Sequence, residues 1–488
     1  MAKNNSFVKQ MIQIGGSTFI NLLIGLFTTP IITRIVEPND YGRFSLFNTY
    51  SSIIMIVFCL GLDQALVRYF YSQDDDEYKK RLFRFCIKFP MIAISALSIG
   101  MVLVFAKLQS IGAIDSWLVL ILFISNLFVA AFNRISILLV RLRYHSGTYS
   151  ILNIVQKAAY VVLVILAAMV FRREYFLILV VATVLSALLV TIISVISEKE
   201  FYITKTQRKN LGISIKTILT YSVPLMISSC VFYAFQAIDK LSINHYLTYA
   251  DVGVYSSAQS LMQVFAIVQT TFNLVWSPKA VEHYEKKPED TEFYSSVHKM
   301  MVIVMFLFGT TVLLCKDLIV LLLGAKYREA AFVIPFLMFN PIMYTLSETT
   351  VNGLYFKEKS YWHVVITITS CVVNIIGNSL LIPIFGISGA AISTGLSYIV
   401  FFELRTFLSN KYYKVNFSLG RTHIILLLTV AFAVKCMNSK TDIITCIMYL
   451  IIVLVIAFLY HKTIRFMWNY FITSLIDKVK SLRRNINE

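Results

Sequence analysis

The feature that most constrains this chain is a series of about fourteen apolar runs, each ~18–24 residues long. A helix of that length spans the ~30 Å hydrocarbon core of a bilayer, whereas barrel strands show about ten residues of alternating polarity. These runs are continuous, and hydrophobic residues make up 58% of the 488 residues. With only 14% charged residues, this composition excludes a soluble globular protein and a disordered chain. The sequence therefore predicts an all-α polytopic membrane protein.

The predicted spans leave little room for any other kind of domain, because no loop exceeds roughly 25 residues. No phosphate-binding GxxxxGK[ST] loop, no HExxH motif and no Cys/His metal spacing occurs in the sequence. We therefore expect no enzyme activity, no catalytic residue, no cofactor and no metal. The predicted spans cover residues 11–32, 46–66, 86–106, 117–139, 149–171, 175–197, 215–237, 252–275, 299–319, 331–354, 362–384, 386–408, 422–437 and 443–461.

The distribution of Lys and Arg predicts the orientation, because short basic loops stay cytoplasmic. With fourteen spans and both termini inside, about 30 of the 44 Lys and Arg fall in cytoplasmic segments and about 11 in external ones. The net charge of +18 is then mainly an orientation signal and an attraction to anionic lipid headgroups. Its scatter over many small loops argues against nucleic-acid binding. The clearest inner segments are 79–81, 205–209, 286–287 and 478–484, and the external pair 172–173 is the exception.

Ionisable residues inside the spans are the main candidates for function, because a charge at bilayer depth normally faces a cavity or a partner. The alternative for those near span ends is snorkelling to the interface. The carboxylates in this set are Asp63 and Glu348. The predicted cavity cations are Arg34, Lys88, Arg134, Lys157 and Lys240.

Polar residues recur at helical spacing along five spans, which places each set on one face of its helix. Such stripes also occur as helix–helix contacts, but five of them favour a wet pathway that is cationic in the first half of the chain. Arg and Lys are the usual partners of phosphate, so we expect an anionic, phosphate-bearing cargo. The stripes are Gln13, Ser17, Asn21, Gly25 and Thr28; Asn153, Gln156, Lys157 and Tyr160; Gln259, Gln263, Thr270, Asn273 and Ser277; Asn340, Tyr344, Glu348, Asn352 and Tyr355; and Thr367, Ser370, Asn374 and Asn378.

An internal repeat links two stretches that are offset by about 211 residues, or six spans. Residues 33–45 and 239–256 each contain a charged helix end, a short outer loop and the pattern Asp-x-Gly-x-aromatic-Ser. An even number of spans implies parallel repeats related by an axis along the membrane normal. This predicts two pseudo-symmetric six-helix lobes, 1–200 and 201–410, with the cargo site between them. Residues 411–488 would add two helices and a basic cytoplasmic tail.

At these residues the chain resembles the polysaccharide-biosynthesis flippases (Wzx-type) of the multidrug/oligosaccharidyl-lipid/polysaccharide exporter superfamily. The stretch 33–42 is similar to that family's first-span signature, and 238–240 with 253–258 is similar to its seventh-span signature. The best match is 374–391, from Asn-Ile-Ile-Gly-Asn to Gly-Ile-Ser-Gly-Ala-Ala. The resemblance covers roughly residues 10–410 and assigns Arg34, Asp239 and Lys240 to shared motifs.

The resemblance implies a fold like that of the multidrug exporters (MATE-like). It also implies transport of an undecaprenyl-diphosphate-linked sugar unit, an O-antigen or capsule repeat, from the inner to the outer leaflet of the bacterial cytoplasmic membrane by alternating access. Partners would be this lipid-linked glycan, membrane lipids, H⁺ or Na⁺ bound at Asp63, Asp239 or Glu348, and a glycan polymerase. Rival hypotheses are a cation-coupled multidrug antiporter, a peptidoglycan-precursor flippase and a membrane-embedded glycan polymerase or ligase.

Overall fold

The computed structural model describes residues 20–110, 115–143, 145–171, 174–203 and 212–469. The polar positions Gln13 and Ser17, the basic segments 205–209 and 478–484, and the pair 172–173 lie outside these residues. The described parts of the chain are helical and contain no strand. This confirms the all-α prediction.

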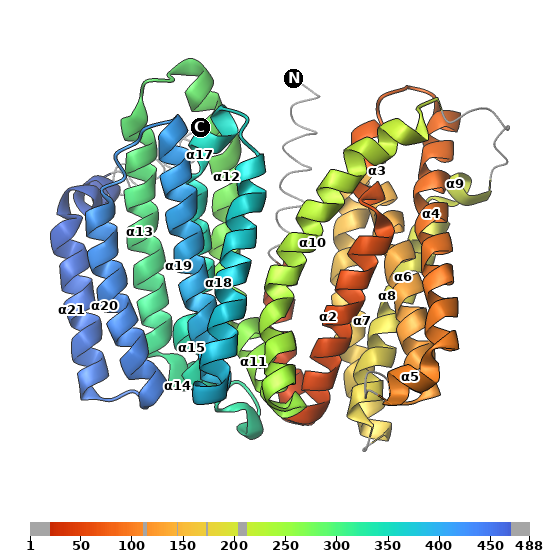
Figure 1. The fold of residues 1–488 in the computed structure, drawn as a ribbon, viewed down its shortest axis with the longest axis horizontal. Helices are drawn as coiled ribbons and strands as arrows, with labels where there is room; N and C mark the ends of the chain where they lie inside the picture. The colour runs from red at the N-terminus through yellow and green to blue at the C-terminus, as the bar shows by residue number, and fades with distance from the viewer. Residues whose placement is uncertain (1–19, 111–114, 144, 172–173, 204–211, 470–488) are drawn as a thin grey trace, which may run out of the picture. The chain divides into compact units, whose positions relative to one another are not determined.

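Long helices follow one another along the described chain (Figure 1). An apolar helix, Ile20–Ile35, comes first. The helices that follow are α2 (Pro38–Cys59), α3 (Leu62–Tyr69), α4 (Asp76–Leu103), α5 (Phe105–Ser110), α6 (Trp117–Leu142), α7 (Ser146–Val170), α8 (Tyr175–Ser197), α9 (Lys199–Ile203), α10 (Ile215–Tyr246), α11 (Tyr249–Leu261), α12 (Val264–Lys286), α13 (Thr291–Leu314), α14 (Lys316–Val320), η1 (Ala325–Tyr327), α15 (Ala330–Leu337), α16 (Phe339–Thr350), α17 (Asn352–Phe356), α18 (Tyr361–Phe385), α19 (Ile387–Tyr412), α20 (Leu419–Asn438) and α21 (Ile443–Leu459).

Ten helices of the described residues are long and apolar enough to cross a membrane, and two bent pairs raise that number to twelve. One pair is α2 with α3, bent by 50°, and the other is α21 with the helix His461–Asn469, bent by 79°. The two predicted spans that remain correspond to the shorter helix Ile20–Ile35 and to α11 with α12. The chain is a multi-pass membrane protein, and the predicted fourteen spans are consistent with these helices.

The ends of several helices follow from local side-chain chemistry. Asp75 caps α4 by accepting hydrogen bonds from the backbone N–H groups of Glu77 and Tyr78. Thr248 and Asp251 form a capping box at the start of α11. α2 ends at Cys59, because the next two residues, Leu60 and Gly61, adopt positive φ angles of 51° and 65°. Glycine tolerates this conformation without steric cost.

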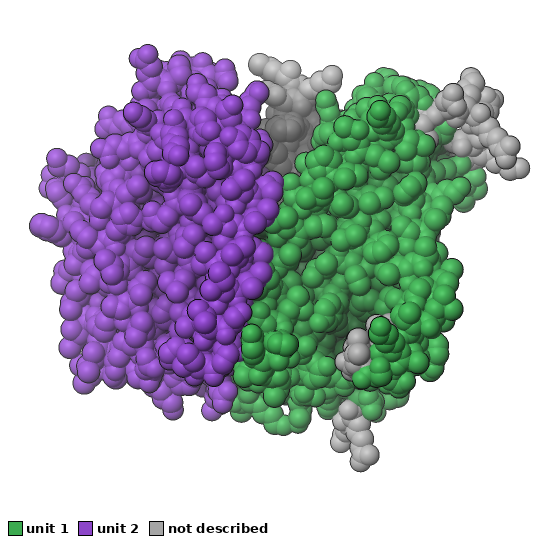
Figure 2. Space-filling view, viewed as in Figure 1, with its two compact units in different colours: residues 1–264, 323–327 green, residues 265–322, 328–488 purple. Residues whose placement is uncertain are grey.

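The chain divides into two compact units (Figure 2). Unit 1 contains residues 1–264 and 323–327, and unit 2 contains residues 265–322 and 328–488. In unit 1, α8 packs against α6 and α7, and α2 packs against α11. In unit 2, α19 packs against α16 and α18. These two units are defined by contacts between residues, whereas the predicted lobes, 1–200 and 201–410, are defined by the sequence repeat. The units therefore do not test the lobe boundaries, which stay a prediction.

The repeated motif marks the place in unit 1 where α2 and α11 pack most closely. A Cβ added to Gly42 would lie 1.7 Å from the carbonyl oxygen of Tyr249, and one added to Gly253 would lie 2.1 Å from that of Pro38. Near this contact, the Oγ atoms of Ser45 and Ser256 are 2.7 Å apart. The two glycines and the two serines are repeat equivalents, so the same residues of both copies meet in one helix contact.

Candidate functional site

Unit 1 contains a cavity of about 610 Å³ with a mixed polar and aromatic lining. The helix Ile20–Ile35 supplies one wall, and α2, α7 and α8 supply the others. Gln263, from the break between α11 and α12, completes the lining. The described lining residues are Asn21, Gly25, Thr28, Thr29, Ile32, Tyr41, Phe44, Asn48, Asn153, Gln156, Lys157, Tyr160, Thr183, Ser186 and Gln263.

Lys157 is the charged residue in this described lining, and no carboxylate accompanies it there. Its Nζ donates a hydrogen bond to the backbone oxygen of Asn21 over 2.8 Å. A Cβ on Gly25 would lie 3.4 Å from this Nζ and 3.3 Å from Oε1 of Gln263. Gly25 therefore leaves room for the ammonium and the amide in one place, and the lining carries a net positive charge.

Two polar atoms at the cavity make no hydrogen bond within the described part of the chain. They are Oδ1 of Asn21 and the hydroxyl oxygen of Tyr160, and both are buried. Buried polar groups are normally satisfied by protein, water or ligand. These two atoms, beside the ammonium of Lys157, therefore offer an acceptor and a hydroxyl to whatever enters the cavity.

Arg134, a predicted cavity cation, forms an ion pair with Asp63, a predicted coupling carboxylate. The Nη2 and Nε atoms of Arg134 donate to Oδ2 of Asp63 over 2.6 and 3.1 Å. Asp63 is buried and Arg134 is half-buried. The pair joins α3 to α6 in unit 1, and Arg134 is absent from the described lining of the cavity.

Unit 2 has its own ion pair, between the half-buried Glu348 of α16 and the buried Arg405 of α19. Nη1 of Arg405 donates to Oε1 of Glu348 over 2.6 Å and to Oγ of Ser347 over 2.7 Å. The guanidinium lies 4.9 Å from the ring centroid of Phe401, in cation–π geometry. The sequence analysis selected Glu348 but missed Arg405, although an arginine inside an apolar span is itself a signal.

The other predicted site residues lie apart from the cavity lining. Arg34 and Lys88 are exposed, while Gln259, Asn273 and Lys240 are half-buried. The carboxylate of Asp239 is buried and accepts a hydrogen bond from the hydroxyl of Tyr255 over 2.7 Å.

Asn352 and Asn374 are buried in unit 2. Asn374 donates to Oγ of Ser393 over 3.4 Å, across the contact between α18 and α19.

Of the predicted site residues, the structure thus brings Lys157, Asn21 and Gln263 together in one cavity. Five further members of the predicted stripes line it as well: Gly25, Thr28, Asn153, Gln156 and Tyr160. The aromatic rings in the lining include Tyr160, which belongs to the predicted stripe on α7, and Phe44, which belongs to none of the predicted stripes. The rings of Phe44 and Tyr160 stack with their centroids 6.3 Å apart. Aromatic residues at helical spacing are common in any core, so the sequence position of Phe44 alone does not distinguish it.

Comparison with known proteins decides the family. The model of the family described as polysaccharide biosynthesis protein matches residues 31–332, more than half of the chain. The chain belongs to this family. The matched residues contain most of the cavity lining and both copies of the repeated motif.

One curated relative of this family member is described as a probable low-salt glycan biosynthesis flippase, Agl15, of Haloferax volcanii. The two are 24% identical over 242 residues, which is 48% of this chain and 50% of the relative. The match thus spans about half the length of that protein.

Solved structures support the fold. The lipid II flippase MurJ, in an inward closed conformation, aligns with a TM-score of 0.67 and 12% identity, over 93% of this chain and all of that one. An inward-facing multidrug resistance MATE family transporter aligns with a TM-score of 0.56 and 13% identity, over 80% of this chain and 94% of that one. At these identities the likeness confirms the predicted MATE-like fold alone.

Proposed function

We propose that this family member is a flippase. Its cargo would be a polyprenyl-diphosphate-linked oligosaccharide, an O-antigen or capsule repeat unit. Transport would run from the inner to the outer leaflet of the bacterial cytoplasmic membrane by alternating access. The observation that carries the proposal is the ammonium of Lys157 in a polar cavity whose described lining has no carboxylate. Such a site attracts an anion and repels a cationic drug.

The residues of the cavity suit the two parts of the proposed headgroup. The ammonium of Lys157 would bind a diphosphate oxygen as a point charge. The amides of Gln263, Asn153 and Asn48 would exchange hydrogen bonds with sugar hydroxyls in place of water. Because a polyprenyl chain is apolar, it would stay in the lipid while the headgroup crosses.

Energy for the cycle would come from a gradient of H⁺ or Na⁺ or from the cargo's own concentration difference, because the sequence has no ATP-binding loop. The candidate carboxylates remain Asp63, Asp239 and Glu348. Asp63 and Glu348 each have an arginine partner, so a coupling ion would have to compete with that arginine. A glycan polymerase would take the translocated unit on the outer side. The termini would both be cytoplasmic.

The test is transport by the purified full chain in proteoliposomes, with a polyprenyl-diphosphate glycan in the vesicle membrane. We expect Lys157→Ala to lower the rate about tenfold or more, since a hydrogen bond to a charged group contributes about 1.5–3 kcal/mol. Lys157→Arg keeps the charge and should retain most of the activity. Lys107→Ala removes an exposed lysine from α5 and is the matched control.

Three outcomes would contradict the proposal. Unchanged transport by the Lys157→Ala protein would remove the cationic cavity from the mechanism. Transport of a cationic dye in preference to the lipid-linked glycan would instead support a multidrug antiporter. A third cargo, a lipid-linked peptidoglycan precursor, should compete poorly with the glycan, and strong competition would favour the precursor flippase.

A further inference from the structure

A second hollow lies in unit 1, between helices α4, α6 and α8. It is an apolar groove of about 420 Å³ that opens to the surface. The flanking residues Ile192 and Ile196 are 51% and 66% exposed. Its described lining is Met91, Phe128, Val129, Phe132, Leu188, Thr191, Ile192, Val195 and Ile196. In a multi-pass membrane protein, such a surface borders acyl chains.

One lining residue of this groove, Phe132, contacts a further aromatic ring. The ring of Tyr202 follows α8 on the short helix α9, and its centroid lies 6.0 Å from that of Phe132. The hydroxyl of Tyr202 donates to Oγ of Ser136 over 2.8 Å, which fixes the ring against α6. Arg84 of α4 donates to the backbone oxygens of Phe201 and Tyr202 over 3.1 and 3.4 Å. The guanidinium of Arg84 is therefore held at the backbone of the residue whose ring contacts Phe132.

A second cation of α4, Lys88, shares a helix face with Arg84 and with the lining residue Met91. Lys88 is four residues after Arg84 and three before Met91, so the three residues share one face of the helix. Lys79 and Arg81 of the same helix are paired with carboxylates. Lys88 is exposed, and it takes part in none of the ion pairs formed within the described ranges. Its ammonium is therefore available to an external anion.

The depth of Lys88 suits a lipid headgroup. Lys88 precedes Leu103, the last residue of α4, by fifteen positions, or about 22 Å of helix. A hydrocarbon core of ~30 Å measured back from Leu103 would end near Arg84. Helical side chains point toward the N-terminus of their helix, so the ammonium of Lys88 extends to that boundary.

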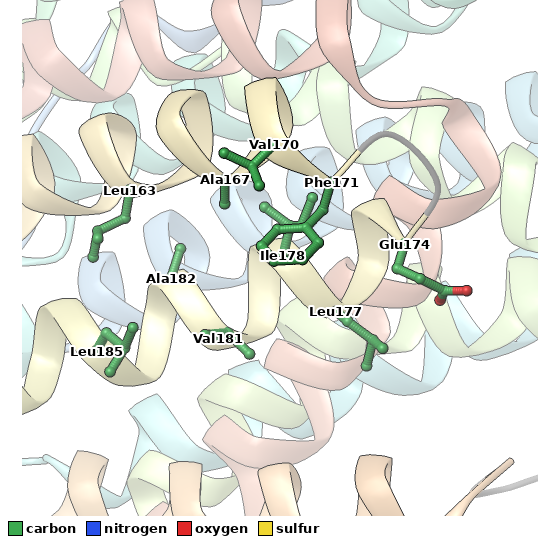
Figure 3. A pocket seen from close by; sticks show the side chains of 10 residues that line it. All are labelled: Leu163, Ala167, Val170, Phe171, Glu174, Leu177, Ile178, Val181, Ala182 and Leu185. Carbon is green, nitrogen blue, oxygen red and sulfur yellow. The ribbon is translucent and has the colours of Figure 1, made fainter.

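A neighbouring groove provides a contrast. It lies between α7 and α8, has a volume of about 560 Å³ and is also apolar (Figure 3). The charged residue in its described lining is Glu174, which lies at one end of the groove beside Phe171. The described lining of this groove contains no lysine or arginine, and it offers a similar apolar surface.

We propose that the groove between α4, α6 and α8 binds an anionic phospholipid. One acyl chain occupies the groove, and the headgroup phosphate contacts Lys88, with Arg84 beside it. With the termini cytoplasmic, this lipid belongs to the inner leaflet. It is a bound membrane lipid rather than the cargo, so the site is independent of the flippase proposal.

The test measures lipid retained by the purified full chain, using native mass spectrometry after reconstitution in mixed phosphatidylglycerol and phosphatidylcholine vesicles. We expect phosphatidylglycerol to be retained in preference, and Lys88→Gln to reduce that preference about fivefold, the effect of one basic residue near a charged surface. Lys107→Gln, on α5, is the control for charge alone. Thermal unfolding of each variant checks that it folds.

A second variant tests the groove itself. Ile192→Trp places a large ring in the groove and should reduce retention of phosphatidylglycerol severalfold, whereas Val181→Trp in the groove of Figure 3 should not. Wild-type retention by the Lys88→Gln protein, or by the Ile192→Trp protein, would overturn the proposal. So would displacement of phosphatidylglycerol by polyprenyl phosphate at lower concentration, which would assign the groove to the cargo's tail.

Discussion

Gly25 shows how a single residue controls the charge in the cavity of unit 1. A methyl group on Gly25 would meet Nζ of Lys157 and Oε1 of Gln263, the far ends of two flexible side chains. We expect Gly25→Ala to leave stability unchanged or raised by up to ~1 kcal/mol, because alanine favours a helix over glycine. Transport should fall severalfold, since the ammonium must move away from its hydrogen bond with Asn21.

The check on this variant is a pair of measurements. Thermal unfolding in detergent should show no loss of stability, while the KM for the lipid-linked glycan should rise. Gly100→Ala is a suitable control, because a Cβ there meets nothing within 4 Å. A fall in stability without a change in KM would mean that Gly25 serves packing alone.

Arg405 and Glu348 should depend on each other for stability. Removing one member of a buried ion pair leaves an uncompensated charge and typically costs about 3–5 kcal/mol. We therefore expect Arg405→Met to lower the unfolding temperature sharply, and the double variant Arg405→Met, Glu348→Gln to recover much of the loss. An additive double variant, measured by thermal unfolding, would show that the two side chains act independently.

At the residue scale, the sequence predicts which spans contain charged side chains better than it predicts which residues pair with them. Lys157, Asn21 and Gln263 were predictable because each interrupts an apolar span at a helical spacing. The pairing of Arg134 with Asp63 was not, because 71 positions separate them in the chain. Arg405 interrupts an apolar span and could have been selected on that ground, but its pairing with Glu348, 57 positions away on another helix, could not be predicted.

At the element scale, the repeat places a glycine from each copy, Gly42 and Gly253, in the contact between α2 and α11. A Cβ at Gly253 would lie 2.1 Å from a backbone oxygen, which cannot move as a side chain can. We expect Gly253→Ala to destabilise the protein by about 1–3 kcal/mol or more, the usual effect of overpacking. Gly42→Ala should have a similar effect, because it faces the same contact from α2.

These glycine variants are best compared with Gly100→Ala in α4, which adds the same methyl group in open space. Thermal unfolding in detergent is the measurement. Equal unfolding temperatures for the Gly253 and Gly100 variants would show that the two helices can separate without loss, and that the contact does not stabilise unit 1.

The interruptions of the helices were beyond what periodicity can predict. The sequence analysis treated span eight as one helix, but α11 ends at Leu261 and α12 begins at Val264. This break is the place from which Gln263 reaches the cavity. Span two breaks in the same way at Gly61, where the backbone adopts a positive φ. A glycine in an apolar run is also compatible with a continuous helix, so sequence alone does not locate such a break.

At the scale of the whole molecule, the all-helical membrane fold was the most predictable feature, since run length and charge content leave few alternatives. The repeat was predictable from two short matching stretches, and their direct contact could be seen only in three dimensions. The orientation in the membrane is not encoded in the folded shape. It follows from the placement of Lys and Arg, and it therefore needs its own test.

Unit 2 allows that test without any assumption about the rest of the chain. Five helices that qualify as spans lie between the loop after α12 and the loop after α20. An odd number of crossings puts these loops on opposite sides of the membrane. The predicted orientation places Glu289 inside and Lys440 outside, and both residues are exposed.

In a cysteine-free background, we therefore expect Lys440→Cys to react in intact cells with a thiol reagent that cannot cross the membrane. Glu289→Cys should react only after the cells are permeabilised, and this second reaction also shows that the variant is folded and present. The reverse pattern would invert the topology and place the basic segments outside, against the attraction of inner anionic lipids. Reaction of both in intact cells would mean that one of the five helices does not cross.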